Sequence, residues 1–204
     1  MEDSMNKTIP ALAIVSLILL SFVPSLAQDQ GSSLNINVRD YCDPTSFNAA
    51  IPAIPPTCVR GTQNPLTNGA ITFQGFVAEV TLDKSVGAWR FAPDQAKVEE
   101  GATINLQSLG GETHTFTRVK RFGGGFVAFL NTASGTPTPA PECAHMVNGN
   151  LVPQPPSADN IFIPAGGSAS TTLTHGEVAR FQCCIHPWMR VTITPKNEDH
   201  EEVH

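Results

Sequence analysis

A chain of 204 residues, of which only 15% are charged, is long enough for one domain of moderate size with appendages. Its 16 Gly and 17 Pro favour a β domain with many turns and argue against a helical bundle. The formal net charge is −6, but residues 1–27 contribute −1 and residues 197–202 contribute −4, so the remainder is close to neutral. Without a basic stripe, nucleic-acid binding is excluded as a function.

Residues 1–27 have the pattern of an export signal. Lys7 precedes an apolar stretch over residues 9–23, and Ser25-Leu26-Ala27 supplies small residues at the −3 and −1 positions of a cleavage site. Cleavage would leave Gln28 as the first mature residue and predicts a secreted or periplasmic protein with no membrane span. The alternative is an uncleaved membrane anchor, although the apolar stretch is short for a span of about 20 residues.

Residues 28–68 are rich in proline and show little periodicity, so we expect an irregular N-terminal extension with one strand at Leu34–Val38. Cys42 and Cys58 lie in this segment. A bridge between them would close a short loop and typically stabilise a protein by about 2–4 kcal/mol. Four cysteines allow three pairings, so the connectivity stays open at this point.

From Ile71 onward, short apolar runs are separated by turn residues, which is typical of a β-sandwich. Alternation in one run predicts that Ile104 and Leu106 face the core. The predicted strands are Ile71–Leu82, Trp89–Ala92, Lys97–Val98, Thr103–Leu106, His114–Val119, Phe126–Leu130, Asn160–Ile163, Ser168–Leu173, Glu177–Cys183 and Arg190–Pro195.

These strands define a predicted domain over residues 69–196, and its fold class is all-β. No helix of ten or more residues is expected in the mature chain. Residues 132–156, rich in Pro, Ala, Thr and Gly, are predicted to form a long loop. Residues 197–204 are predicted to be an acidic disordered tail.

One short segment combines three metal-ligand types. Cys183, His186 and Met189 follow one another at Cys-x-x-His-x-x-Met spacing. A thiolate, two imidazoles and a weak thioether ligand form the blue-copper set. The second imidazole must come from elsewhere, and His114, at the start of a predicted strand after a glycine turn, is the candidate. A lone Cys-x-x-His would also suit a structural zinc half-site, but zinc sites use more Cys or His ligands.

From about Trp89 to Pro195 the chain resembles the cupredoxins, the plastocyanin, azurin and amicyanin group of blue copper proteins. The resemblance rests on the Trp89-x-Phe91-x-Pro93 pattern, on His114-Thr115-Phe116-Thr117 and on the 183–189 segment. It implies a Greek-key β-sandwich that holds one type 1 copper ion. His114, Cys183 and His186 would be the equatorial ligands and Met189 the axial ligand.

Two departures from the family pattern concern the ligand loop. Thr115 stands where many relatives have an Asn that braces this loop, and its hydroxyl is expected to make a similar hydrogen bond. The second departure is the doubled cysteine. Cys184 as the ligand would be too close to His186, a Cys183–Cys184 disulfide would abolish the site, and alternation along a strand would let Cys184 pair with Cys143.

The resemblance implies a one-electron carrier, not an enzyme, with a redox donor and a redox acceptor as partners and with the edge of His186 as the electron port. Nothing in the sequence requires more than a monomer. The alternatives are a copper storage or delivery protein and an electron-transfer subunit of a larger oxidase or reductase complex. Six histidines without a His-x-His pair are too few for a trinuclear copper cluster within the chain.

Overall fold

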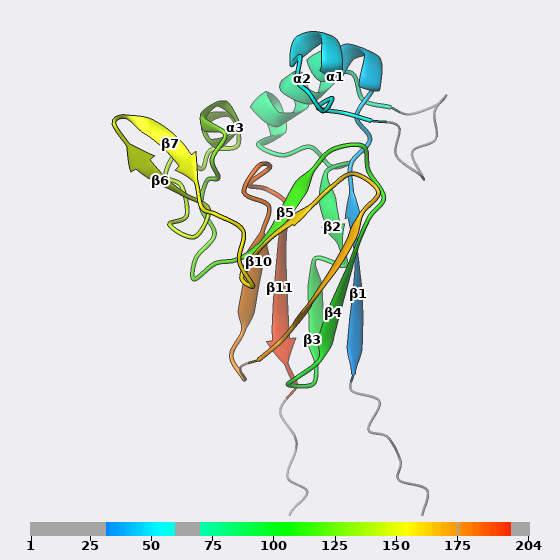
Figure 1. Ribbon diagram of the computed structural model, residues 1–204, viewed down its shortest axis with the longest axis vertical. Helices are drawn as coiled ribbons and strands as arrows, with labels where there is room; N and C mark the ends of the chain where they lie inside the picture. Colours follow the sequence, from blue (N-terminus) through cyan, green and yellow to red (C-terminus); the bar gives the residue numbers. More distant parts are fainter. Residues whose placement is uncertain (1–31, 60–69, 175, 197–204) are drawn as a thin grey trace, which may run out of the picture. The chain divides into compact units, whose positions relative to one another are not determined.

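The computed structural model describes residues 32–59, 70–174 and 176–196 (Figure 1). The predicted export signal and the predicted acidic tail lie outside these residues. Among the described residues, no helix is long and apolar enough to cross a membrane.

Two β-sheets form the body of the described chain (Figure 1). The four-stranded sheet has the order β2 (Arg90–Ala92), β1 (Ser33–Arg39), β4 (Thr103–Ser108) and β9 (Ser168–Thr172). The five-stranded sheet has the order β3 (Gln95–Val98), β11 (Arg190–Pro195), β10 (Ala179–Gln182), β5 (His114–Arg118) and β8 (Asn160–Ile163). Buried side chains from both sheets belong to one hydrophobic core. The predicted β-sandwich is therefore confirmed.

The strand β4 shows the predicted alternation, with Ile104 and Leu106 buried and the residues between them exposed. It pairs in parallel with β1, whose Ile36 and Val38 are also buried. The strand expected at Leu34–Val38 is thus present and is a central strand of its sheet. The described part of residues 28–68 therefore contributes to the core of the sandwich, where Ile36 and Val38 are buried with side chains from both sheets.

The segment predicted as a strand at Ile71–Leu82 is a helix, α2 (Phe73–Asp83), and it follows a shorter helix, α1 (Pro44–Ala50). With 11 residues, α2 also contradicts the expectation that long helices are absent. Its apolar residues Phe73, Phe76, Val77 and Val80 have the i, i+3, i+4, i+7 spacing of one helical face. The hydroxyl of Thr72 accepts a hydrogen bond from the Gly75 N–H and caps the first turn.

The strand predicted at Phe126–Leu130 is also wrong, because this segment leads into the helix α3 (Ala128–Ala133). The side-chain amide of Asn131 accepts a hydrogen bond from the Gly125 N–H (2.6 Å) and donates one to the Gly125 carbonyl (2.9 Å). These two bonds tie the helix to Gly125, just before the predicted strand, and so fold the chain back on itself.

The predicted long loop at 132–156 contains a β-hairpin of β6 (Ala144–Val147) and β7 (Asn150–Pro153). Asn148 and Gly149 form its two-residue turn, both with positive φ (50° and 82°). Asn-Gly is the preferred sequence for such a turn, because both positions must adopt the left-handed conformation.

Two disulfides resolve the open connectivity. Cys42 is bonded to Cys58 and Cys143 to Cys184, so Cys183 is the free cysteine. The first bridge ties the end of β1 to the segment after α1. The second bridge ties the segment just before β6 to the residue that follows Cys183.

Helices α1 and α2 lie at the end of the sandwich where the loop between β10 and β11 turns (Figure 1). Phe76 of α2 contacts the rings of Trp89 (4.9 Å between centroids) and Trp188 (5.8 Å), the latter in that loop. The helices therefore cover the loop that carries the predicted copper ligands. We call α1 and α2 the helical cap.

We predict that Phe76→Ala lowers the free energy of unfolding by about 3–5 kcal/mol, as is usual for truncation of a buried Phe. Leu82→Ala is the matched control on the same helix, and it should change stability by less than about 0.5 kcal/mol. Phe76 is 3% exposed and Leu82 is 78% exposed. Denaturant unfolding measures both variants. Equal losses would contradict the helix, because residues 76 and 82 share one face only in a strand.

Candidate metal centre

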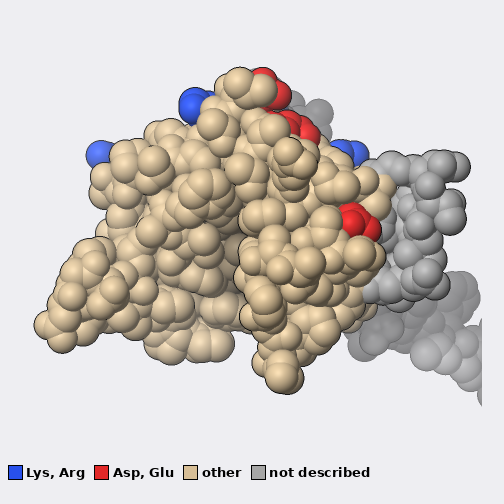
Figure 2. Space-filling view, turned by 90° about the horizontal axis from the view of Figure 1, so that it is seen from above, with Lys and Arg blue, Asp and Glu red and all other residues tan. Residues whose placement is uncertain are grey.

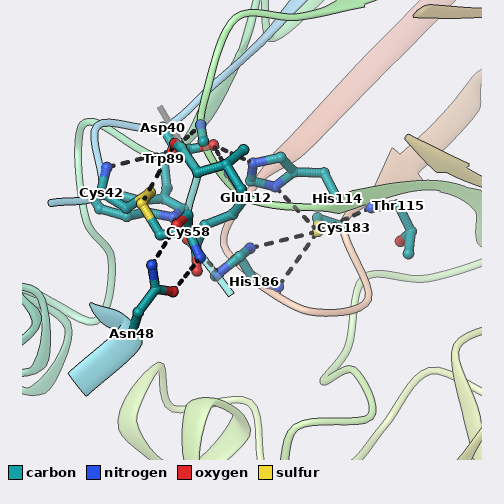
Figure 3. Close-up of polar contacts among 12 residues, drawn as sticks. Asp40, Cys42, Asn48, Cys58, Trp89, Glu112, His114, Thr115, Cys183 and His186 are labelled. Carbon is teal, nitrogen blue, oxygen red and sulfur yellow. Dashed lines mark hydrogen bonds and ion pairs between the residues drawn. A yellow bond between two sulfur atoms is a disulfide. The ribbon is translucent and has the colours of Figure 1, made fainter. Parts of the chain in front are cut away.

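Three of the four predicted ligands meet at the capped end of the sandwich (Figure 3). His114 begins β5, Cys183 directly follows β10, and His186 lies in the loop from β10 to β11. The Sγ atom of Cys183 is 3.8 Å from Nδ1 of His114 and 3.8 Å from Nδ1 of His186. All three side chains are buried, and their ligand atoms lie within 4.8 Å of one another.

The spacing of these atoms fits a single metal ion. Typical bonds of about 2.0 Å to nitrogen and 2.3 Å to sulfur would separate the two donor atoms by about 3.5–3.7 Å at tetrahedral to trigonal angles. The observed separations of 3.8 Å are close to that range. The residues are therefore arranged as a His₂Cys metal site, a donor set that suits copper.

Met189 closes the ligand loop through its backbone. Its N–H donates to the carbonyl of His186 (2.9 Å), and its carbonyl accepts from the N–H of Cys183 (2.9 Å). Its side chain is buried in the core. These bonds give the loop a fixed shape, while the role of the Met189 sulfur as a ligand remains a prediction.

The backbone also holds the thiolate. The N–H groups of Thr115 and His186 point to Sγ of Cys183 at 3.4 Å and 3.5 Å. The hydroxyl of Thr115 accepts a hydrogen bond from the Cys184 N–H (2.7 Å). Thr115 thus braces the ligand loop with its hydroxyl, as expected from its position after His114.

Cys184 points away from the site, because consecutive residues of an extended segment face opposite sides. Its disulfide with Cys143 rules out both Cys184 as the ligand and a Cys183–Cys184 disulfide. Gly125 lies directly behind it, where an added Cβ would collide with the carbonyl of Cys184, and the Phe126 N–H donates to that carbonyl (2.8 Å). The close approach of Gly125 supports the loop from its rear.

Two buried carboxylates stand behind the imidazoles, and the sequence analysis missed both (Figure 3). Oδ2 of Asp40 lies 2.8 Å from Nε2 of His114. Oε2 of Glu112 lies 3.5 Å from Nε2 of His186 and accepts a hydrogen bond from Nε1 of Trp89 (2.6 Å). No spacing signal links Asp40 to His114, because they are 74 residues apart.

These contacts shift the ionisation of the site in the absence of a metal. Burial alone disfavours charge on His114 and Cys183, but their mutual contact and the bond to Asp40 outweigh it. The pKa of His114 rises to about 10, and the pKa of Cys183 falls well below its ordinary value. Burial likewise opposes ionisation of Asp40, but its bond to His114 keeps its pKa low, whereas burial raises the pKa of Glu112. The thiolate that a metal requires is thus already favoured.

The prediction that His186 presents an exposed edge is wrong, because this residue is only 2% exposed. Its ring lies 5.5 Å from Trp188, 6.1 Å from Phe76 and 6.4 Å from Trp89, measured between centroids. The helical cap and the Trp188 ring therefore separate the metal site from solvent.

No protein-family model and no curated protein matches the chain. Similar solved structures include a purple cupredoxin from Nitrosopumilus maritimus (15% identity, 54% of this chain and 86% of that chain, TM-score 0.33). They also include oxidised plastocyanin from Dryopteris crassirhizoma (20%, 55% and 93%, TM-score 0.31) and an amicyanin mutant in the reduced Cu(I) form (13%, 55% and 77%, TM-score 0.31). At such low TM-scores the likeness carries no weight for function, which rests on the residues of this chain.

We predict that Thr115→Val lowers the free energy of unfolding by about 1–3 kcal/mol, because the Cys184 N–H would be buried without an acceptor. Hydrogen exchange of the Cys184 amide tests the cause, since this amide should exchange faster in Thr115→Val. The control Thr115→Ser keeps the hydroxyl and should retain slow exchange. Unchanged protection in Thr115→Val would contradict the bracing role.

Proposed function

We propose that the protein binds one copper ion as a type 1 centre and acts as a one-electron carrier. His114, Cys183 and His186 would hold the ion, with Met189 as a weak axial ligand. The observation that carries the proposal is the buried cluster of two Nδ1 atoms around the free thiol of the chain, all within 4.8 Å. Copper bound by this donor set exchanges one electron between Cu(II) and Cu(I).

The burial of the site supports electron transfer over copper delivery. A delivery site must present its ligands to a partner that removes the ion. Here the three ligands are buried, and the helical cap covers the loop that bears two of them. Electrons can cross a layer of packed aromatic rings, whereas a metal ion cannot leave without displacing it. No substrate has to reach the metal, so no enzymatic step is proposed.

The partners proposed are a redox donor and a redox acceptor that dock weakly at the capped end. Seen from that end, most of the surface carries neither basic nor acidic side chains, and the charged ones lie near the rim (Figure 2). A small contact area suits the brief encounters of electron-transfer proteins. The two disulfides support the proposal that the protein works outside the reducing cytosol, in a secreted or periplasmic setting.

The visible spectrum of the Cu(II)-loaded protein, before and after ascorbate, tests this function. We expect an intense blue band that bleaches on reduction and returns on reoxidation in air. Cys183→Ser and His114→Ala should each abolish the band, because each removes an equatorial ligand. The double variant Cys143→Ser/Cys184→Ser is the control, and it should keep the band wherever it folds. A colourless wild-type protein that still binds metal would refute the carrier function.

Instead of an exposed edge of His186, the partly exposed ring of Trp188 would serve as the route by which the electron reaches the surface. This ring contacts His186. We predict that Trp188→Leu slows electron self-exchange several-fold without changing the blue band, whereas Trp188→Phe, which keeps an aromatic ring, changes the rate less. Line broadening in NMR spectra of mixed Cu(I) and Cu(II) protein measures the rate. A wild-type rate in Trp188→Leu would exclude this route.

A further inference from the structure

The carboxylate of Asp40 is surrounded by N–H donors. Oδ1 accepts hydrogen bonds from the backbone N–H groups of Gly111 (2.8 Å) and Cys42 (3.4 Å). Oδ2 accepts from the N–H of Glu112 (3.1 Å) and lies 2.8 Å from Nε2 of His114. Asp40 is 1% exposed, and its ion-pair partner is His114. A buried side chain in these surroundings must accept hydrogen bonds with both terminal atoms.

An ionised carboxylate suits these surroundings, because it accepts on both oxygens and donates nothing. An Asn amide would turn its own N–H₂ group toward one of the N–H donors. Since Asp40 only accepts, the His114 nitrogen that faces it must carry a proton. The proton therefore sits on Nε2, and Nδ1 is the nitrogen left to bind a metal beside Cys183, 3.8 Å away.

The glycine turn before β5 leaves room for this carboxylate. An added Cβ on Gly110 would collide with Oδ2 and Cγ of Asp40. Gly110 does not need positive φ, so its lack of a side chain serves the close approach of Asp40. The groups around Asp40 thus come from two segments far apart in the sequence: Cys42, shortly after β1, and the turn that leads into His114.

We propose that Asp40 is a positioning residue for the metal centre: it fixes His114 with Nδ1 toward the metal and, as a buried anion, stabilises Cu(II) over Cu(I). This inference rests on the proposed copper function. Outer partners of ligand histidines typically change metal affinity about 10–100-fold when they are removed. Because the charge of Asp40 favours the more positive ion, Cu(II) affinity should depend on it more than Cu(I) affinity does.

The test compares the reduction potentials of copper-loaded wild type, Asp40→Asn and Asp43→Asn. Asp43 lies on the same segment but is partly exposed and caps α1, a role that Asn also fills. We expect Asp40→Asn to lose about 10-fold or more in Cu(II) over Cu(I) preference, which raises the potential by about 59 mV per tenfold. Asp43→Asn should retain the wild-type potential. A potential in Asp40→Asn at or below that of wild type would overturn the proposal.

A second measurement needs neither a folded variant nor copper. In zinc-loaded wild-type protein with ¹⁵N-labelled histidine, long-range ¹H–¹⁵N spectra report which ring nitrogen carries the proton. We expect His114 to carry a slowly exchanging proton on Nε2 and to bind zinc through Nδ1. A His114 without a proton on Nε2 would overturn the positioning role. A colourless copper-loaded wild type would instead refute the carrier function and leave this zinc result intact.

Discussion

The metal site depends on the antiparallel pairing of β5 with β10. In this register Thr117 lies opposite Gln182, and continuation of the pairing sets Thr115 beside Cys184. The sheet thereby brings His114 to Cys183 across 69 residues of chain. Once that contact exists, the short loop to β11 needs only its two internal backbone bonds to return His186 to the same point. The hydrogen bonds of the sheet, rather than contacts between the ligand side chains, thus set the positions of these side chains. A rigid scaffold of this kind keeps a metal site preorganised.

The helical cap changes what such a site can do. Between β1 and β2 the chain leaves the sandwich, forms α1 and α2, and packs Phe47 and Phe76 against Trp89. The Cys42–Cys58 bridge holds this segment near the end of β1. A site closed in this way is shielded from water and small molecules, which suits the proposed electron exchange through the surrounding rings. Trp188 lies in the ligand loop and is partly exposed, which makes it the link between His186 and the surface.

Local patterns in the sequence were sufficient to predict the sandwich and the grouping of His114, Cys183 and His186, but not the helices that cover this group. Alternation at Ile104 and Leu106 predicted a strand correctly, and the Cys-x-x-His spacing pointed to the loop in which Cys183 and His186 meet His114. The helical spacing of Phe73, Phe76, Val77 and Val80 was also present, but aromatic and β-branched residues favour strands by propensity, and this led to the wrong assignment. The carboxylate of Asp40 had no local signal at all. It is recognisable only after β1 and the Gly110 turn have been brought together, because its partners are backbone N–H groups of a distant segment.

The burial of the site and the position of Asp40 bear on each other through charge. Two neutral imidazoles and one thiolate around Cu(II) have a net charge of +1, and around Cu(I) a net charge of zero. Because a buried net charge is costly, closing such a site by itself favours the reduced ion. In the proposed centre, the Asp40 carboxylate lowers the net charge of both states by one, to zero for Cu(II) and −1 for Cu(I), with Glu112, whose pKa is raised by burial, counted as neutral. The same low-dielectric cap then favours Cu(II). The helical cap and the Asp40 carboxylate therefore act together. By excluding water, the cap strengthens the interaction between the copper ion and nearby charges. The charge of Asp40 then determines which oxidation state that interaction stabilises.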